Sequence, residues 1–304
     1  MQPLKFTCKV ITPLFLGGAD GEAPELRAPS IKGGMRYWWR AMHANLPIAE
    51  MQKREARIFG GASPGQRSKV LIRIPDAGKN HGRISAPLAP HKDFMRKDAI
   101  EPGEQFTLQL TLMAGQPLYE YSKLEPNEQL EKHFILTCLL GGFGKRVRRG
   151  MGSVGVVSIQ RSGEPEVDYQ MPVSLNAIHE LMSSLAPKYF ELKDTFIISR
   201  FIKADRYPYI KEIHLGRGES RENLLMRISN ATHQFKEQND RKIYEASMGH
   251  AFKGRFASPV YISTVEHSGA LHPIITRLYT HPDYHHKDGV DLELQSKFID
   301  AVKQ

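Results

Sequence analysis

Hydrophobic and polar residues alternate along short segments in the first half of the chain. Leu4–Val10 and Phe106–Leu112 alternate at every position, which is the pattern of a strand with one buried face. Apolar residues at every second position from Val70 to Ile74 mark a shorter strand, and the run Val154–Ile159 indicates another. We therefore expect four strands in this half.

Two helices are expected between these strands. Ser30 is a suitable N-cap for a helix over Ile31–Leu46. Pro126 suits the first turn of a second helix, which carries Leu130, Phe134, Cys138 and Leu139 on one face. The resulting order, β-α-β-β-α-β, is the ferredoxin-like arrangement that RNA-recognition modules share. Pro75–Gly103 is too long for a simple connection and is interpreted as an insertion or a functional loop.

The second half predicts a further α+β unit. Phe196–Ile202 indicates a strand and Glu222–Phe235 a helix, while Val260–Val265 and Ile274–Tyr279 indicate a hairpin. The hairpin is expected to close around Ser268 and Gly269, and a short helix with Leu294, Phe298 and Val302 ends the chain. We place the domains at residues 1–164 and 165–304.

Charge and composition narrow the choice of partner. The 304 residues are 40% hydrophobic and 25% charged, as in ordinary globular proteins. A net charge of +9 favours an acidic partner, most simply RNA or DNA. We expect no transmembrane helix and no signal peptide, and the two cysteines are interpreted as reduced core thiols of a cytoplasmic protein.

The segment from Leu140 to Gly155 combines six glycines with four cations. Glycine permits positive φ, and successive bare amides can form an anion-binding nest. Gly150, Gly152 and Gly155 spell a dinucleotide-binding motif, but they precede a strand instead of opening a helix, and no P-loop serine or threonine is present. We therefore expect RNA phosphates to bind here, with a solvated turn as the alternative; the residues are Gly142, Gly144, Lys145, Arg146, Arg148, Arg149 and Gly150.

The first predicted helix carries a basic stripe of Lys32, Arg36 and Arg40. Cations four residues apart repel one another unless an anion joins them, so the stripe is either a second RNA contact or a solvated face. Trp38 and Trp39 are about 100° apart around the helix. We expect one ring in the core, and Trp39 either stacks on a base or packs against a neighbouring domain.

These segments carry a family resemblance. ITPLFLGGAD (Ile11–Asp20), LRAPSIKG (Leu26–Gly33), MRYWWR (Met35–Arg40) and the glycine-rich loop together resemble the RAMP superfamily, and within it the first RAMP subunit of the Cmr-type, type III-B CRISPR effector complex. Ile58–Gly60 and the stretch from Arg255 to Val260 add to this resemblance, which is dense over residues 6–75 and 139–157 and thin elsewhere.

The resemblance implies two ferredoxin-like domains, the second less regular, in an α+β fold. It also implies a noncatalytic RNA-binding role in antiviral defence, in contact with the 3′ part of the guide RNA, with target RNA and with other RAMP subunits. Base pairing, and not the protein, would then read the sequence.

Two other functions remain as alternatives. Some RAMP relatives process guide-RNA precursors without a metal, and His43 at the end of the basic helix is the candidate general acid or base for such an endoribonuclease. A basic scaffold for acidic protein surfaces is the third possibility. His281, His285 and His286 are interpreted as a solvated loop, and we expect no metal site there. We also expect no catalytic residue and no cofactor.

Overall fold

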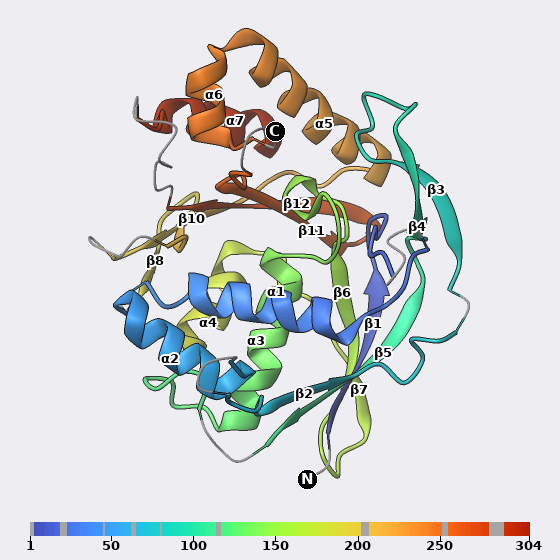
Figure 1. The fold of residues 1–304 in the computed structure, drawn as a ribbon, viewed down its shortest axis with the longest axis vertical. Helices are drawn as coiled ribbons and strands as arrows, with labels where there is room; N and C mark the ends of the chain where they lie inside the picture. The colour runs from blue at the N-terminus through green and yellow to red at the C-terminus, as the bar shows by residue number, and fades with distance from the viewer. Residues whose placement is uncertain are drawn as a thin grey trace.

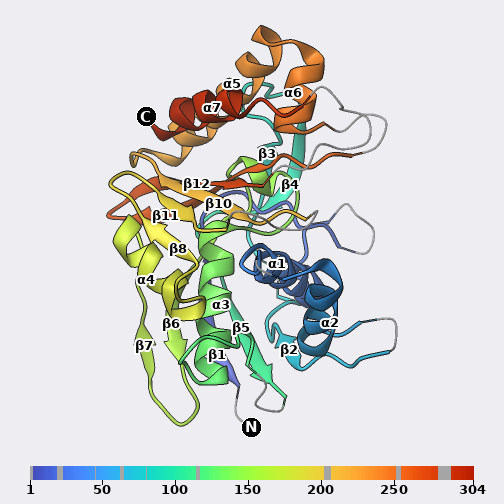
Figure 2. The ribbon, with the colours of Figure 1, turned by 90° about the vertical axis from the view of Figure 1, so that its left-hand side faces the viewer.

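Helices and sheets alternate in four layers in the computed structural model (Figures 1 and 2). The structure describes residues 3–18, 23–44, 46–61, 65–79, 81–113, 117–201, 207–250, 255–279 and 289–304. One five-stranded sheet lies at the bottom of Figure 1 and the other near the top, with α1, α3 and α4 between them and α5, α6 and α7 above.

The first sheet confirms the ferredoxin-like prediction. Its strands run in the order β2-β5-β1-β6-β7, and every neighbouring pair is antiparallel. The strands are β1 (Leu4–Val10), β2 (Val70–Arg73), β5 (Gln105–Leu112), β6 (Val154–Gln160) and β7 (Glu166–Asp168). Phe6 lies opposite Leu108 in the register, and both are fully buried. The alternation therefore placed one apolar face correctly in the core.

The helices of this half depart from the prediction at their ends. α1 spans Ala28–Ala41 with Arg27 as its N-cap, because Pro29 fits the first turn and starts the helix before Ser30. α2 (Ile48–Phe59) was not predicted. α3 (Pro126–Leu140) is buried around almost its whole circumference, because it packs between β6 of the first sheet and β11 of the second.

The segment 75–103 forms a separate two-stranded sheet. β3 (Arg83–Pro87) pairs with β4 (Arg96–Ile100). Figure 1 shows the hairpin rising along one side of the molecule, from the first sheet towards α5. The predicted insertion is therefore an ordered element that connects the two halves.

The second sheet is a ferredoxin-like unit with an exchanged strand. Its order is β11-β12-β10-β9-β8, with strands β8 (Phe190–Leu192), β9 (Ile197–Ser199), β10 (Ile210–Leu215), β11 (Val260–His267) and β12 (Ala270–Leu278) and helices α4 (Leu175–Leu185), α5 (Arg221–Gln238), α6 (Arg241–Met248) and α7 (Leu292–Lys303). β10, α5, β11, β12 and α7 follow the ferredoxin-like order, but β9, from earlier in the chain, takes the place of the fourth strand. This substitution makes the unit less regular.

Local predictions in this half hold in part. Ser268 and Gly269 both have positive φ, 49° and 78°, as a two-residue hairpin turn requires, and the hairpin is confirmed. The predicted strand 196–202 is only three residues long, and Ile202 lies outside the described residues. The domain boundary after residue 164 stays a prediction. None of the helices described is long and apolar enough to cross a membrane.

Candidate nucleic-acid interface

The glycine-rich loop connects α3 to β6 and contains the 3-10 turn η1 (Val147–Arg149). Three of its amides donate to backbone carbonyls elsewhere in the chain: Lys145 to that of Phe15 (3.0 Å), Gly150 to that of Ile262 (2.9 Å) and Gly152 to that of Pro13 (3.0 Å). These three amides hold the loop against the protein and are therefore not free to bind an anion.

The glycines serve close packing instead. Gly144 and Gly152 have φ of 91° and 69°, and a Cβ at either position would overlap a backbone carbonyl, that of Phe15 or Phe143. Gly142 is buried against the backbone of Gly152, and Gly150 (φ 80°) against side chains of α5. Glycine is required at Gly144 and Gly152 because the positive φ and the nearby carbonyls leave no room for a side chain.

Arg148 connects the glycine-rich loop to both halves of the chain, through Tyr37 in the first and Tyr261 in the second. Its guanidinium carbon lies 5.2 Å from the ring centroids of both Tyr37 and Tyr261. The same group donates hydrogen bonds to the Ser258 carbonyl and to the Tyr37 hydroxyl. Arg148 is thus held between α1 and β11, which gives it a structural role.

Arg149 is buried without a carboxylate partner among the described residues. It donates to the Val260 carbonyl (2.9 Å) and to Ser258 Oγ (3.0 Å), and it is 9% exposed. Burial lowers the pKa of its guanidinium to about 10, so the group remains charged at neutral pH. An unneutralised buried cation raises the local positive potential.

Lys145 and Arg146 are the exposed cations of the loop. Arg146 has a left-handed φ of 62°, and its Nε donates to the Leu88 carbonyl (3.0 Å) of the β3–β4 connection. No ion pair involving either side chain occurs within the described part of the chain. Both cations can therefore accept an anionic partner.

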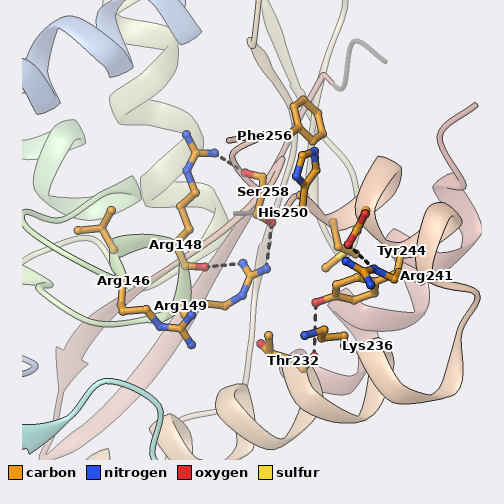
Figure 3. Close-up of a pocket in the computed structure, with 14 residues that line it drawn as sticks. Arg146, Arg148, Arg149, Thr232, Lys236, Arg241, Tyr244, His250, Phe256 and Ser258 are labelled. Atoms are coloured by element: carbon orange, nitrogen blue, oxygen red, sulfur yellow. Dashed lines mark hydrogen bonds and ion pairs between the residues drawn. The ribbon is translucent and has the colours of Figure 1, made fainter. Parts of the chain in front are cut away.

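A cavity of about 840 Å³ lies between this loop and α5–α6. Figure 3 shows the loop arginines on one side and Lys236, Arg241 and Tyr244 on the other. Of its fourteen lining residues, five are arginine or lysine and one, Glu245, is acidic. Glu245 pairs with Arg241 at 2.8 Å. We define this feature, with its lining residues, as the basic cavity.

Sequence reasoning missed the half of the cavity that α5 and α6 supply. Helix periodicity predicted α5 but gave no indication of which face meets the loop. One signal was present: Ser258 belongs to the Arg255–Val260 stretch, and its hydroxyl and carbonyl bind Arg149 and Arg148. That stretch is therefore part of the support for the loop.

The basic stripe of α1 faces elsewhere. Arg36 and Arg40 both donate to Glu55 Oε1 on α2, each at 2.6 Å, and Lys32 donates to Ser68 Oγ. One carboxylate thus offsets part of the positive charge. The structure does not bring this stripe to the basic cavity, although the arginine side chains remain 35% and 33% exposed.

Trp39 cannot stack on a base in this structure. The residue is 1% exposed, and its indole donates to the Leu118 carbonyl (2.9 Å). That prediction is wrong because Trp38 and Trp39 are both buried: Trp38 packs on Tyr261 and Trp39 on His43. Trp38 thus meets the second half at Tyr261, whereas Trp39 packs within the first half near His43 and Phe59.

His43 is enclosed in the same cluster. Its ring stacks on Tyr119 with centroids 4.9 Å apart, and its Nδ1 lies 2.6 Å from the Trp39 carbonyl. Burial lowers its pKa to about 3, so the ring is neutral at physiological pH. A buried neutral imidazole cannot reach a scissile phosphate, which removes the residue on which the endoribonuclease alternative depended.

No metal-binding group of three or more candidate side chains occurs among the described residues. His281, His285 and His286, which the sequence suggested to be a solvated loop, lie outside them.

Replacing Arg148 with lysine is expected to lower the free energy of unfolding by about 1–2 kcal/mol, because an ammonium cannot keep both hydrogen bonds while lying between two rings. Urea unfolding measures the change. Arg57→Lys, on an exposed part of α2, is the control and should change it by less than about 0.5 kcal/mol. Equal effects of the two substitutions would contradict the structural role of Arg148.

Comparison with known proteins agrees with this architecture. The family model of the RAMP superfamily matches residues 7–155. The CRISPR system Cmr subunit Cmr1-2 of Pyrococcus furiosus is 27% identical over 183 residues, covering 50% of this chain and 93% of the relative. Cmr1-1 of the same organism is 26% identical over 311 aligned positions, covering 91% of this chain and 88% of the relative.

Solved structures show the same fold. The crystal structure of Cmr1 from Pyrococcus furiosus in its apo form covers 99% of this chain and 96% of its own, with a TM-score of 0.56 and 20% identity. A chain of the type III-B Cmr-β complex bound to cognate target RNA covers 99% and 98%, with a TM-score of 0.61 and 11% identity. From the motifs, the two ferredoxin-like units and these relatives together, the chain is similar to proteins of the RAMP superfamily and, over most of its length, to Cmr1 subunits.

Proposed function

We propose that this chain is a noncatalytic RNA-binding subunit of a type III-B CRISPR effector complex. The observation that carries the proposal is the basic cavity, in which cations outnumber the single carboxylate. The relatives support the setting, since they are named as Cmr subunits and one matching structure contains cognate target RNA. The partners are then guide RNA, target RNA and other RAMP subunits.

Phosphate is the ligand that best fits the cavity. Arg149 is buried without a carboxylate among the described residues, and the cost of holding such a charge is reduced when an anion lies nearby. Arginine and lysine side chains bind phosphate through charge-assisted hydrogen bonds. Contacts of this kind orient RNA without reading its sequence.

The proposed contacts are four exposed cations. Arg146, Lys236 and Arg241 line the cavity, and Lys145 precedes Arg146 in the loop. Arg148, Arg149 and the glycines position the loop. Lys32, Arg36 and Arg40 are retained as an outer contact for the same RNA, because their side chains remain partly exposed.

The salt dependence of RNA binding tests this assignment. Replacing Lys145, Arg146, Lys236 and Arg241 together with alanine is expected to reduce the slope of log affinity against log salt by about 3, because each lost phosphate contact on a single strand contributes about 0.7. Fluorescence anisotropy with labelled single-stranded RNA at several salt concentrations gives the slope.

The matched control removes the same charge from other exposed positions, Lys53, Lys79, Lys123 and Lys193, none of which lines the cavity. This variant should keep a slope close to that of the wild type. Equal losses in both variants would show that net charge, and not the basic cavity, binds RNA.

A further inference from the structure

The connection between β3 and β4 contacts α5 through His91, in addition to the apolar packing of Ala86 and Ala99 near Leu225. His91 Nδ1 lies 2.6 Å from Ser229 Oγ, and the backbone amide of His91 also donates to this hydroxyl (3.4 Å). Ser229 is 3% exposed. The imidazole of His91 stacks on that of His233, with centroids 4.7 Å apart and planes inclined by 18°. A segment of the first half is therefore fixed to a helix of the second.

Three residues before His91, the same segment contacts the glycine-rich loop. The Leu88 carbonyl accepts the hydrogen bond from Arg146 Nε. Nε is one of the five donors of a guanidinium, and its use by the carbonyl leaves the two terminal nitrogens available. Arg146 also lines the basic cavity, so the docked hairpin restricts the orientation of a side chain that faces the cavity (Figure 3).

We propose that the β3–β4 hairpin is a positioning element of the RNA site: docked on α5 through His91 and Ser229, it orients Arg146 towards the basic cavity through the Leu88 carbonyl. The proposal rests on the proposed function for the identity of the ligand. Its physical basis is preorganisation, because a side chain that is already oriented loses less conformational freedom when it binds phosphate.

The charges around His91 favour docking at neutral pH. His91 faces Ser229 and His233 from α5, Lys92 from its own segment and Arg146 from the loop, and His233 lies 4.0 Å from Glu237. Partial burial, His233 and these cations lower the pKa of His91. The docked state thus favours the neutral ring, and docking should weaken as the pH falls below 6.5.

Docking is tested first without RNA, by hydrogen–deuterium exchange of peptides covering residues 84–99. At pH 7.5, Ser229→Ala and His91→Ala should each accelerate exchange in this segment, whereas Asn230→Ala, an exposed neighbour on α5, should not. After correction for intrinsic rates, the wild type at pH 5.5 should approach the two variants. Exchange at the wild-type rate in both Ser229→Ala and His91→Ala would overturn the docking step.

Positioning is tested by a double-mutant cycle on affinity for single-stranded RNA. The pair His91→Ala/Ser229→Ala is expected to weaken binding about threefold to tenfold, the range of one hydrogen-bonded contact. In an Arg146→Ala background the same pair should have almost no further effect, because there is no longer a guanidinium to orient. A purely structural role would give the same loss in both backgrounds and would overturn the proposal.

The two proposals fail in different ways. If the wild type binds no RNA, the proposed function is wrong, whereas the exchange experiment still decides whether the hairpin docks. If the wild type binds RNA and the cycle shows additive losses, the RNA site stands and the positioning role is wrong.

Discussion

Gly152→Ala is expected to destabilise the folded chain by about 3–5 kcal/mol. Gly152 has a φ of 69°, and a Cβ there would overlap the Phe143 carbonyl oxygen. That oxygen belongs to backbone that cannot move easily, because the Phe143 amide donates to the Gly152 carbonyl at 2.9 Å. Denaturant unfolding followed by circular dichroism measures the loss.

The matched control is Gly163→Ala. Gly163 has a similar φ of 77°, but apart from its chain neighbours no atom lies within 4 Å of the position that a Cβ would take. Only the conformational cost of a left-handed alanine remains there, about 1–2 kcal/mol. If the two substitutions cost the same, the tight packing of the loop against Phe143 would not be the reason for the glycine.

Acid is expected to destabilise the chain through two buried histidines. His133 is 0% exposed; its Nδ1 lies 2.8 Å from the Tyr119 hydroxyl and its Nε2 2.9 Å from the Met35 carbonyl. Burial lowers its pKa to about 4, and that of His43 to about 3. Both rings are therefore neutral in the folded chain over the whole physiological range.

The direction of the effect follows from proton uptake. Below pH 6.5 the unfolded histidines bind protons that the folded ones do not, so the stability that is fully present at neutral pH decreases as the pH falls towards 4. For the two residues together, the loss between pH 7.5 and pH 4.5 is on the order of 5 kcal/mol. Urea unfolding at a series of pH values measures it.

His43→Phe should remove about half of this pH dependence, because phenylalanine can fill the space beside Trp39 and Tyr119 but does not titrate. The test is how the free energy of unfolding of this variant changes with pH, and not its value at neutral pH. An unchanged pH dependence in this variant would show that His43 is not the group that resists protonation.

The first ferredoxin-like unit could be predicted because its signals are local. The alternation in Leu4–Val10 and Phe106–Leu112 corresponds to strands with one buried face, and the order of elements then fixes the strand order. α2 and the β3–β4 hairpin were missed for different reasons. α2 follows α1 closely with no strong start signal, and the docking of the hairpin depends on His91 meeting Ser229, 138 positions away in the chain.

The candidate site was only half predictable. The cations of the loop are visible in the sequence, but whether each is exposed or buried depends on segments far from it. Arg149 is buried because Val260 and Ser258 lie across from it, and Arg36 and Arg40 are paired because α2 supplies Glu55. Periodicity gives the face of a helix, and not the partner that this face meets.

The burial of α3 between the two sheets has a consequence for how the chain can be divided. Leu4 of the first strand and Leu278 of the last belong to one continuous apolar cluster, so neither half has a complete interior by itself. A fragment ending before the second sheet would expose a long apolar helix to water and tend to aggregate.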